Sequence, residues 1–159
     1  MTVTWVKGWV GATDGESSMA HWKAQTLCGN RHFDAGEHAR ALDYYQQALW
    51  LARQQFACWP DADEAVAALV VAHHNLADLL VAMTLPDRAA DMLCHVHDCL
   101  LATSQSPASP DPLRAAALRH SRGTRTELLA FVRKHGHHDG ILRCLGQCQC
   151  QTEPAHQLH

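Results

Sequence analysis

The sequence lacks a long apolar run and an excess of positive charge. We find no uninterrupted hydrophobic stretch of the length that a membrane-spanning helix needs, and residues 1–15 do not read as a signal peptide. The net charge is −3, so a generally basic surface for DNA or RNA is not expected. We therefore predict a cytoplasmic protein with no membrane and no nucleic-acid partner.

Sequence motifs of familiar catalytic sites are also absent. The chain contains no P-loop and no GxGxxG, GxSxG or HExxH pattern. A cysteine nucleophile would need a histidine poised beside it, and no local pattern specifies such a pair. We predict that the protein catalyses no reaction.

Cysteine and histidine, in contrast, are abundant, with 7 Cys and 13 His among 159 residues. The odd number of cysteines and the lack of an export signal argue against a disulfide framework. Reduced thiols and neutral imidazoles are ligands for transition metals. A metal site therefore has to be considered.

The patterning of residues 17–135 is typical of a helical domain. Apolar residues recur at spacings of three and four, and no β-hairpin signal interrupts them. The pattern predicts an all-α fold of about five helices in antiparallel pairs, at 17–33, 38–58, 61–83, 86–103 and 111–135. Asp61 and Glu64 have the spacing of a capping box at the start of the third helix.

The two ends of the chain differ from this domain. Residues 1–16 contain several glycines and form an arm whose order the sequence leaves open, although Trp5 and Trp9 could fold back onto the domain. Residues 136–159 are rich in cysteine and histidine and poor in apolar residues, which predicts a mobile tail.

Part of the helical domain resembles the tetratricopeptide repeat family. Residues 24–49 match the family's pattern of small residues and turn glycine with Gly29, Gly36, Ala41, Tyr45 and Ala48. Residues 73–96 match it less fully, because threonine stands at the turn position 84 and valine at the small position 96. The resemblance covers residues 22–100 and implies a stack of α-hairpins. So small a stack would be completed by the fifth helix or by a second subunit, so a homodimer is one of two possibilities.

The resemblance also implies a function as a non-catalytic adaptor that binds a protein or peptide along a concave helical face. The side chains expected there are Lys23, Asn30, Phe33, His74, Asn75, Asp78, Arg114 and Arg122. Some family members clamp a terminal carboxylate with lysine and asparagine, but Thr26 occupies the lysine position here. The alternative is that these residues are the solvated face of amphipathic helices.

A small cytosolic metal-binding protein is the alternative function. Thiolate and imidazole ligands suit Zn, Cu or Ni, and the expected ligands in the tail are His137, His138, Cys144, Cys148 and Cys150. A second half-site is the pair His95 and Cys99, four residues apart on one helix face. For His73 we expect a buried ring that bonds to the backbone.

Overall fold

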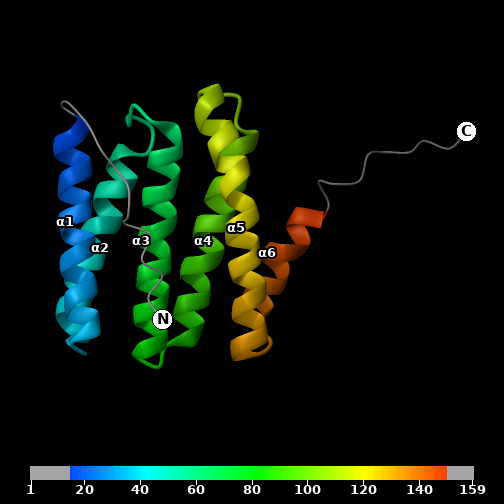
Figure 1. Ribbon diagram of the computed structural model, residues 1–159. Helices are drawn as coiled ribbons and strands as arrows, with labels where there is room; N and C mark the ends of the chain where they lie inside the picture. Colours follow the sequence, from blue (N-terminus) through cyan, green and yellow to red (C-terminus); the bar gives the residue numbers. More distant parts are fainter. Residues whose placement is uncertain (1–14, 150–159) are drawn as a thin grey trace, which may run out of the picture.

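The structure is a computed structural model that describes residues 15–149 (Figure 1). This range holds six α-helices and no strand: α1 (Gly15–Asp34), α2 (His38–Gln55), α3 (Ala62–Ala82), α4 (Pro86–Gln105), α5 (Asp111–His135) and α6 (Asp139–Gln149). The prediction of an all-α fold is confirmed, and the first five helices lie where the sequence predicts them. The helices stand side by side as a row of hairpins, with α6 at the end of the row (Figure 1).

The α1–α2 and α3–α4 turns have the same local structure. Gly36 and Thr84 both adopt left-handed backbone conformations, with φ of 74° and 61°. In each turn the next residue donates its amide to a carbonyl five residues back, Glu37 to His32 and Leu85 to Leu80, at 2.8 Å. Thr84 thus adopts the conformation that glycine adopts in the first hairpin.

Helix α3 begins at the predicted cap. The Asp61 side chain accepts a hydrogen bond from the Glu64 backbone amide at 3.0 Å. This bond satisfies one of the free amides of the first helical turn.

We expect Asp61→Ala to lower the free energy of unfolding by about 1 kcal/mol, since the freed amide loses its acceptor. Urea unfolding followed by circular dichroism measures this change. Asp61→Asn keeps an acceptor at the same place and should stay close to the wild type. Equal losses for both variants would contradict the capping role.

The helices pack through small residues. A Cβ atom added at Gly29 would lie 2.4 Å from the ring of Tyr45, so α1 and α2 approach as closely as glycine permits. Tyr45 is buried, and Ala41, Ala48 and Ala52 are also buried along α2. One apolar cluster joins α1, α2 and α3 with parts of α4 and α5, and a second joins α3, α4, α5 and α6.

The prediction of a mobile tail is wrong for residues 139–149. This segment forms α6 and packs against α4 and α5. Its buried residues Ile141, Cys144 and Leu145 recur at spacings of three and one, so they lie on a single helix face. They pack with Leu93 and Leu128 in the second cluster.

Helix α3 also differs from an expectation. By length and composition alone it could cross a membrane, because an 18-residue window has a mean hydropathy of 1.6. However, 56% of that window is buried inside the domain. Four other helices contact α3. A single such helix is weak grounds for a membrane span, since a buried core helix meets the same criteria.

Candidate functional site

One surface of the domain is formed by the odd-numbered helices. Helices α1 and α5 both contact α3 but not each other, so α3 is the middle of this surface. Helical spacing aligns one row of α3 residues, which we call the α3 stripe: Asp63, Ala67, Val70, Val71, His74 and Asp78. We refer to the whole surface as the odd-helix face.

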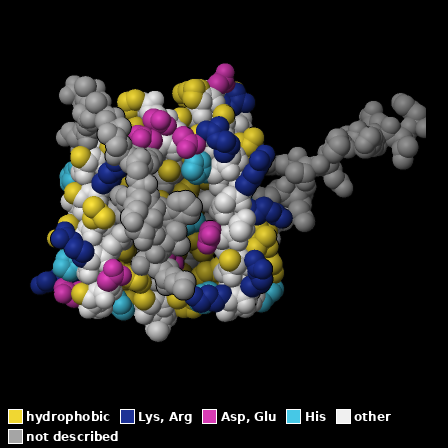
Figure 2. All heavy atoms as spheres, viewed as in Figure 1, with side chains coloured by type: hydrophobic (Ala, Val, Ile, Leu, Met, Phe, Trp, Pro, Cys, Tyr) yellow, Lys and Arg dark blue, Asp and Glu magenta, His cyan; other side chains and the backbone are white. Residues whose placement is uncertain are grey.

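The upper end of the stripe is joined to α5 by charged side chains. Asp63 accepts hydrogen bonds from Arg119 at 2.9 Å and from His120 at 3.2 Å. The bond from Arg119 is the largest of the effects that lower the pKa of Asp63. Figure 2 displays acidic, basic and histidine side chains meeting over this end. A hollow of about 500 Å³ lies beside the ion pair, between the first turns of α3 and α5.

The lower end of the stripe is marked by Asp78, whose pKa is shifted by charges on α5. Asp78 is exposed at its edge, yet the protein around it raises its pKa, first through burial and then through the charge of Glu127 on α5. Lys134 acts on Asp78 in the opposite sense. On the other side, the charges of Asp34 and Asp78 add to burial in raising the pKa of Tyr45. Glu127 and Lys134 of α5 thus act on Asp78 in opposite senses, and Asp34 of α1 and Asp78 of α3 both act on Tyr45.

His74 lies between these ends. Its Nε2 is buried and has no hydrogen-bond partner. Burial lowers the pKa of His74 to about 4, so the ring is neutral at pH 7. The neighbouring Val70 and Val71 are half-buried and pack against the first apolar cluster, which joins α1, α2 and α3. The middle of the stripe is therefore apolar, with one polar atom that lacks a partner.

Several residues predicted for the partner-binding face point elsewhere. Asn30 accepts a hydrogen bond from the Tyr45 hydroxyl at 2.7 Å, within the α1–α2 pair. Phe33 packs against the first apolar cluster, and its ring is tilted relative to that of His38. Arg114 bonds to Asp111 and to the carbonyl of Ser104, at the end of α4. The helix face of these residues could be predicted from helical spacing, but the partners that they bond to could not, because those partners lie on other turns or other helices.

The other predicted residues remain compatible with the odd-helix face. His74 and Asp78 belong to the α3 stripe, and Asn75 is half-buried beside it. Lys23 of α1 acts electrostatically on Glu64, at the start of α3. Arg122 is exposed on α5. Glu127 was not predicted for this face, because only the packing of α5 against α3 brings its charge to Asp78.

The predicted metal ligands of the tail are not brought together. His137 contacts Asp139 at 2.6 Å, whereas His138 faces Asp87 of α4 at 3.6 Å. Cys144 is buried and donates a hydrogen bond to Asp98 at 3.2 Å. The Cys148 side chain and the whole of Cys150 lie outside the described residues.

Cys144 also interacts with a second thiol. The hydrogen bond between Cys94 and Cys144 lowers the pKa of Cys94 and raises that of Cys144, which burial and Asp98 raise further. Cys144 is therefore a protonated, buried contact between α4 and α6. The sequence signal for this role is the spacing that places Cys144 on the same face of α6 as Ile141 and Leu145.

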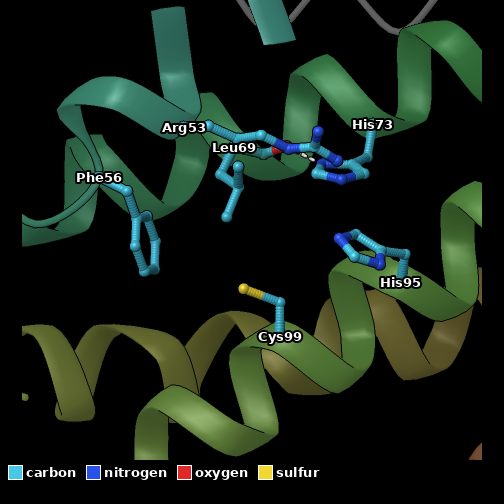
Figure 3. A pocket seen from close by; sticks show the side chains of 6 residues that line it. All are labelled: Arg53, Phe56, Leu69, His73, His95 and Cys99. Carbon is cyan, nitrogen blue, oxygen red and sulfur yellow. Dashed lines mark hydrogen bonds between the residues drawn. The ribbon is translucent and has the colours of Figure 1, made fainter. Parts of the chain in front are cut away.

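A second hollow, of about 220 Å³, lies between α2 and α4 with α3 as its floor (Figure 3). Six side chains line it: Arg53, Phe56, Leu69, His73, His95 and Cys99. The rings of His73 and His95 stack with their centroids 5.5 Å apart. His73 Nδ1 donates to the Leu69 carbonyl at 2.8 Å, as predicted for a buried ring, and its Nε2 has no partner.

This hollow does not complete a metal site. Within the part of the chain that the structure describes, no three His, Cys, Asp or Glu side chains are grouped so as to hold a metal ion. His97, from the same stretch of α4, is buried and bonds to Thr124 of α5 at 2.7 Å. His120 of α5 bonds to Asp63 of α3. The histidines of α4 that were considered as metal ligands therefore have separate structural partners.

Comparisons with known proteins yield one match. A family model described as "Protein of unknown function (DUF2753)" matches residues 20–158. No curated protein and no solved structure matches the chain.

Proposed function

This chain belongs to the DUF2753 family of proteins of unknown function, and from its geometry we propose that it is a non-catalytic helical adaptor. The proposed site is the odd-helix face. The proposed partner is a peptide segment with apolar side chains and at least one cationic group, which lies along the α3 stripe between α1 and α5.

The single observation that carries this proposal is His74. A buried polar atom without a partner is uncommon in folded proteins and costs free energy. His74 places such an atom in the middle of an otherwise apolar stripe. A donor from a bound peptide would satisfy it once the half-buried His74 ring turns toward the surface, while Val70 and Val71 supply apolar contact on the same turn.

The charge at the lower end supports a cationic group on the partner. The charge of Glu127 raises the pKa of Asp78, and a lysine or arginine of the partner would relieve the repulsion between these two carboxylates. A terminal carboxylate would add to that repulsion. Asn30, which the carboxylate clamp would need, is already bonded to Tyr45. The proposed face therefore selects a cationic group, whereas the clamp would select a terminal carboxylate.

The resemblance to tetratricopeptide repeats favours the same face, because that family binds peptides along the first helix of each hairpin. The resemblance would assign those positions to α1, α3 and α5. The homodimer and the cytoplasmic location stay predictions. Helix α6 covers part of the core, for which the sequence had offered the fifth helix or a second subunit as the cover.

Peptides selected from a random phage-displayed library are expected to combine apolar residues with lysine or arginine. Asp78→Lys should weaken their binding at least tenfold, because it reverses the charge at the lower end of the stripe. Fluorescence anisotropy with synthetic copies of the selected peptides measures the dissociation constants.

Asp43→Lys is the matched control, since Asp43 is an exposed aspartate on α2, away from the stripe. It should leave the affinity within about twofold of the wild type. Selected peptides that are acidic, or that bind both variants with equal affinity, would overturn the proposal. Circular dichroism verifies that both variants keep their helices.

A further inference from the structure

We propose that Cys94 of α4 and Cys144 of α6 form a redox-active pair, which a peroxide oxidises to a disulfide bond between the two helices. Neither residue belongs to the odd-helix face, so the pair is a modification site separate from the proposed binding site. Its substrate is a small hydroperoxide, for which hydrogen peroxide is the probe.

Three reactive side chains converge where α6 packs on α4. Cys94 and Asp98 are four residues apart and therefore lie on one face of α4. Cys144 donates a hydrogen bond to Asp98 at 3.2 Å and also shares a hydrogen bond with Cys94. Both thiols lie in the second apolar cluster, where Cys94 packs against the residues around Cys144. Cys144 thus contacts a second thiol and a carboxylate at the same time.

The two thiols differ in exposure. Cys144 is buried under α6, whereas Cys94 is only partly buried and has the exposed His95 beside it on α4. Asp98, one turn further along α4, is also exposed. A molecule as small as hydrogen peroxide can therefore reach Cys94 from solvent, while Cys144 is reached only through Cys94. This order is the one expected of an attacking and a resolving cysteine.

The charge states of the two thiols differ in the same sense. The hydrogen bond with Cys144 is the largest effect on Cys94 and lowers its pKa, and the charge of Arg143 adds to this effect. Burial and the charges of Asp98 and Asp91 act in the opposite sense on Cys94. The bond with Cys94, burial and Asp98 all raise the pKa of Cys144. Because the thiolate is the nucleophile, Cys94 is the thiol that attacks the peroxide.

The oxidation proceeds in two steps. In the first, the Cys94 thiolate attacks one oxygen of hydrogen peroxide and the O–O bond breaks. Cys94 becomes a sulfenic acid, and the hydroxide that leaves takes a proton from solvent to form water.

In the second step, the Cys144 sulfur attacks the Cys94 sulfur and the S–O bond breaks. The proton of Cys144 passes to the Asp98 carboxylate, which already accepts its hydrogen bond, and then to the leaving hydroxide, which departs as water. Two thiols are thereby oxidised to one disulfide, and the peroxide is reduced to two molecules of water.

The disulfide would fasten α6 covalently to the domain. The loop that it closes contains about 50 residues, and closing a loop of this length restricts the unfolded chain. We expect oxidation to raise the midpoint of urea unfolding by about 1 M, and dithiothreitol to reverse the change. An unchanged or lower midpoint after complete oxidation would contradict the joining of α6 to α4.

The direct test maps the disulfides of the full chain by mass spectrometry after treatment with hydrogen peroxide and alkylation of the remaining thiols. Trypsin and endoproteinase Asp-N separate Cys94 from Cys99, because Asp98 lies between them, and fragmentation of the linked peptide locates its partner within residues 144–159. We expect a peptide that links Cys94 to Cys144. The absence of a linked peptide, or linkage of Cys94 to another cysteine instead, would overturn the proposal.

A second test treats Cys144→Ser with hydrogen peroxide and dimedone, a reagent that traps sulfenic acids. Without its resolving thiol, Cys94 should carry about ten times more adduct than in the wild type. Cys58→Ser is the matched control, because Cys58 is an exposed free cysteine, and this variant should form the same disulfide as the wild type. Adducts at Cys58 with none at Cys94 would contradict the proposal. The disulfide mapping needs no substitution, so it tests the pair independently of how Cys144→Ser folds.

Discussion

Replacing Gly29 with alanine should lower the free energy of unfolding by about 1–3 kcal/mol, although alanine is the better helix former. The added Cβ would lie 2.4 Å from two ring carbons of Tyr45. Tyr45 is buried and its hydroxyl is tied to Asn30 at 2.7 Å, so the ring cannot move aside without losing that bond. The α1–α2 pair would have to separate, which is why the loss is expected to exceed the gain in helix propensity. Urea unfolding followed by circular dichroism measures it.

Gly123 provides the matched control for this substitution. It lies inside α5, and a Cβ added there has nothing within 4 Å. Gly123→Ala should therefore stabilise the domain by up to about 1 kcal/mol. In a Tyr45→Leu background the cost of Gly29→Ala should shrink, because the obstructing ring is gone. A stabilising effect of Gly29→Ala in the wild-type background would contradict the close packing of α1 and α2.

The domain should lose about 2–4 kcal/mol of stability between pH 7 and pH 5, because buried histidines resist protonation. Burial is the main cause that lowers the pKa of His73 and of His74 to about 4, and it also lowers the pKa of His97. In the unfolded chain these rings have a pKa of about 6.5. As the pH falls below that value, the unfolded state binds protons that the folded state excludes, so stability falls until the pH reaches the folded-state pKa.

Urea unfolding at a series of pH values, followed by circular dichroism, measures this loss. His73→Asn keeps a nitrogen that can donate to the Leu69 carbonyl but removes the titrating group, so its profile should be flatter than that of the wild type. His21→Asn is the control, since His21 is exposed on α1. Equal stability of the wild type at pH 7 and pH 5 would rule out neutral buried rings.

The proposed function depends on how exposed and buried polar groups are distributed over the odd-helix face. An ion pair closes its upper end, carboxylates gather at its lower end, and His74 lies between them. The hollow between α2 and α4 is smaller than the one between α3 and α5, and most of the residues that line it belong to the core. We therefore assign partner binding to the odd-helix face and a structural role to the stacked His73 and His95.

The local elements of the fold could be predicted from the sequence because their signals lie within a few residues of each other. Asp61 and Glu64 define the start of α3, and Pro86 and Pro112 lie in the first turns of α4 and α5. The spacing of Ala41, Tyr45 and Ala48 defines the buried side of α2. The same logic applied to Ile141, Cys144 and Leu145 would have predicted α6, but the many cysteines and histidines around them obscured that stripe.

The site depended on contacts that no local pattern contains. Asp63 and Arg119 are 56 residues apart, and the Glu127 and Lys134 charges that act on Asp78 of α3 come from α5. The sequence by itself determined the helices, their order and the residues of each helix face, because hydrogen bonds and helical periodicity act over one or two turns. Only the tertiary structure decided that Asn30 bonds to Tyr45, that His74 has no partner and that α6 joins the core. Those outcomes depend on the rotation and distance of helices far apart in the chain.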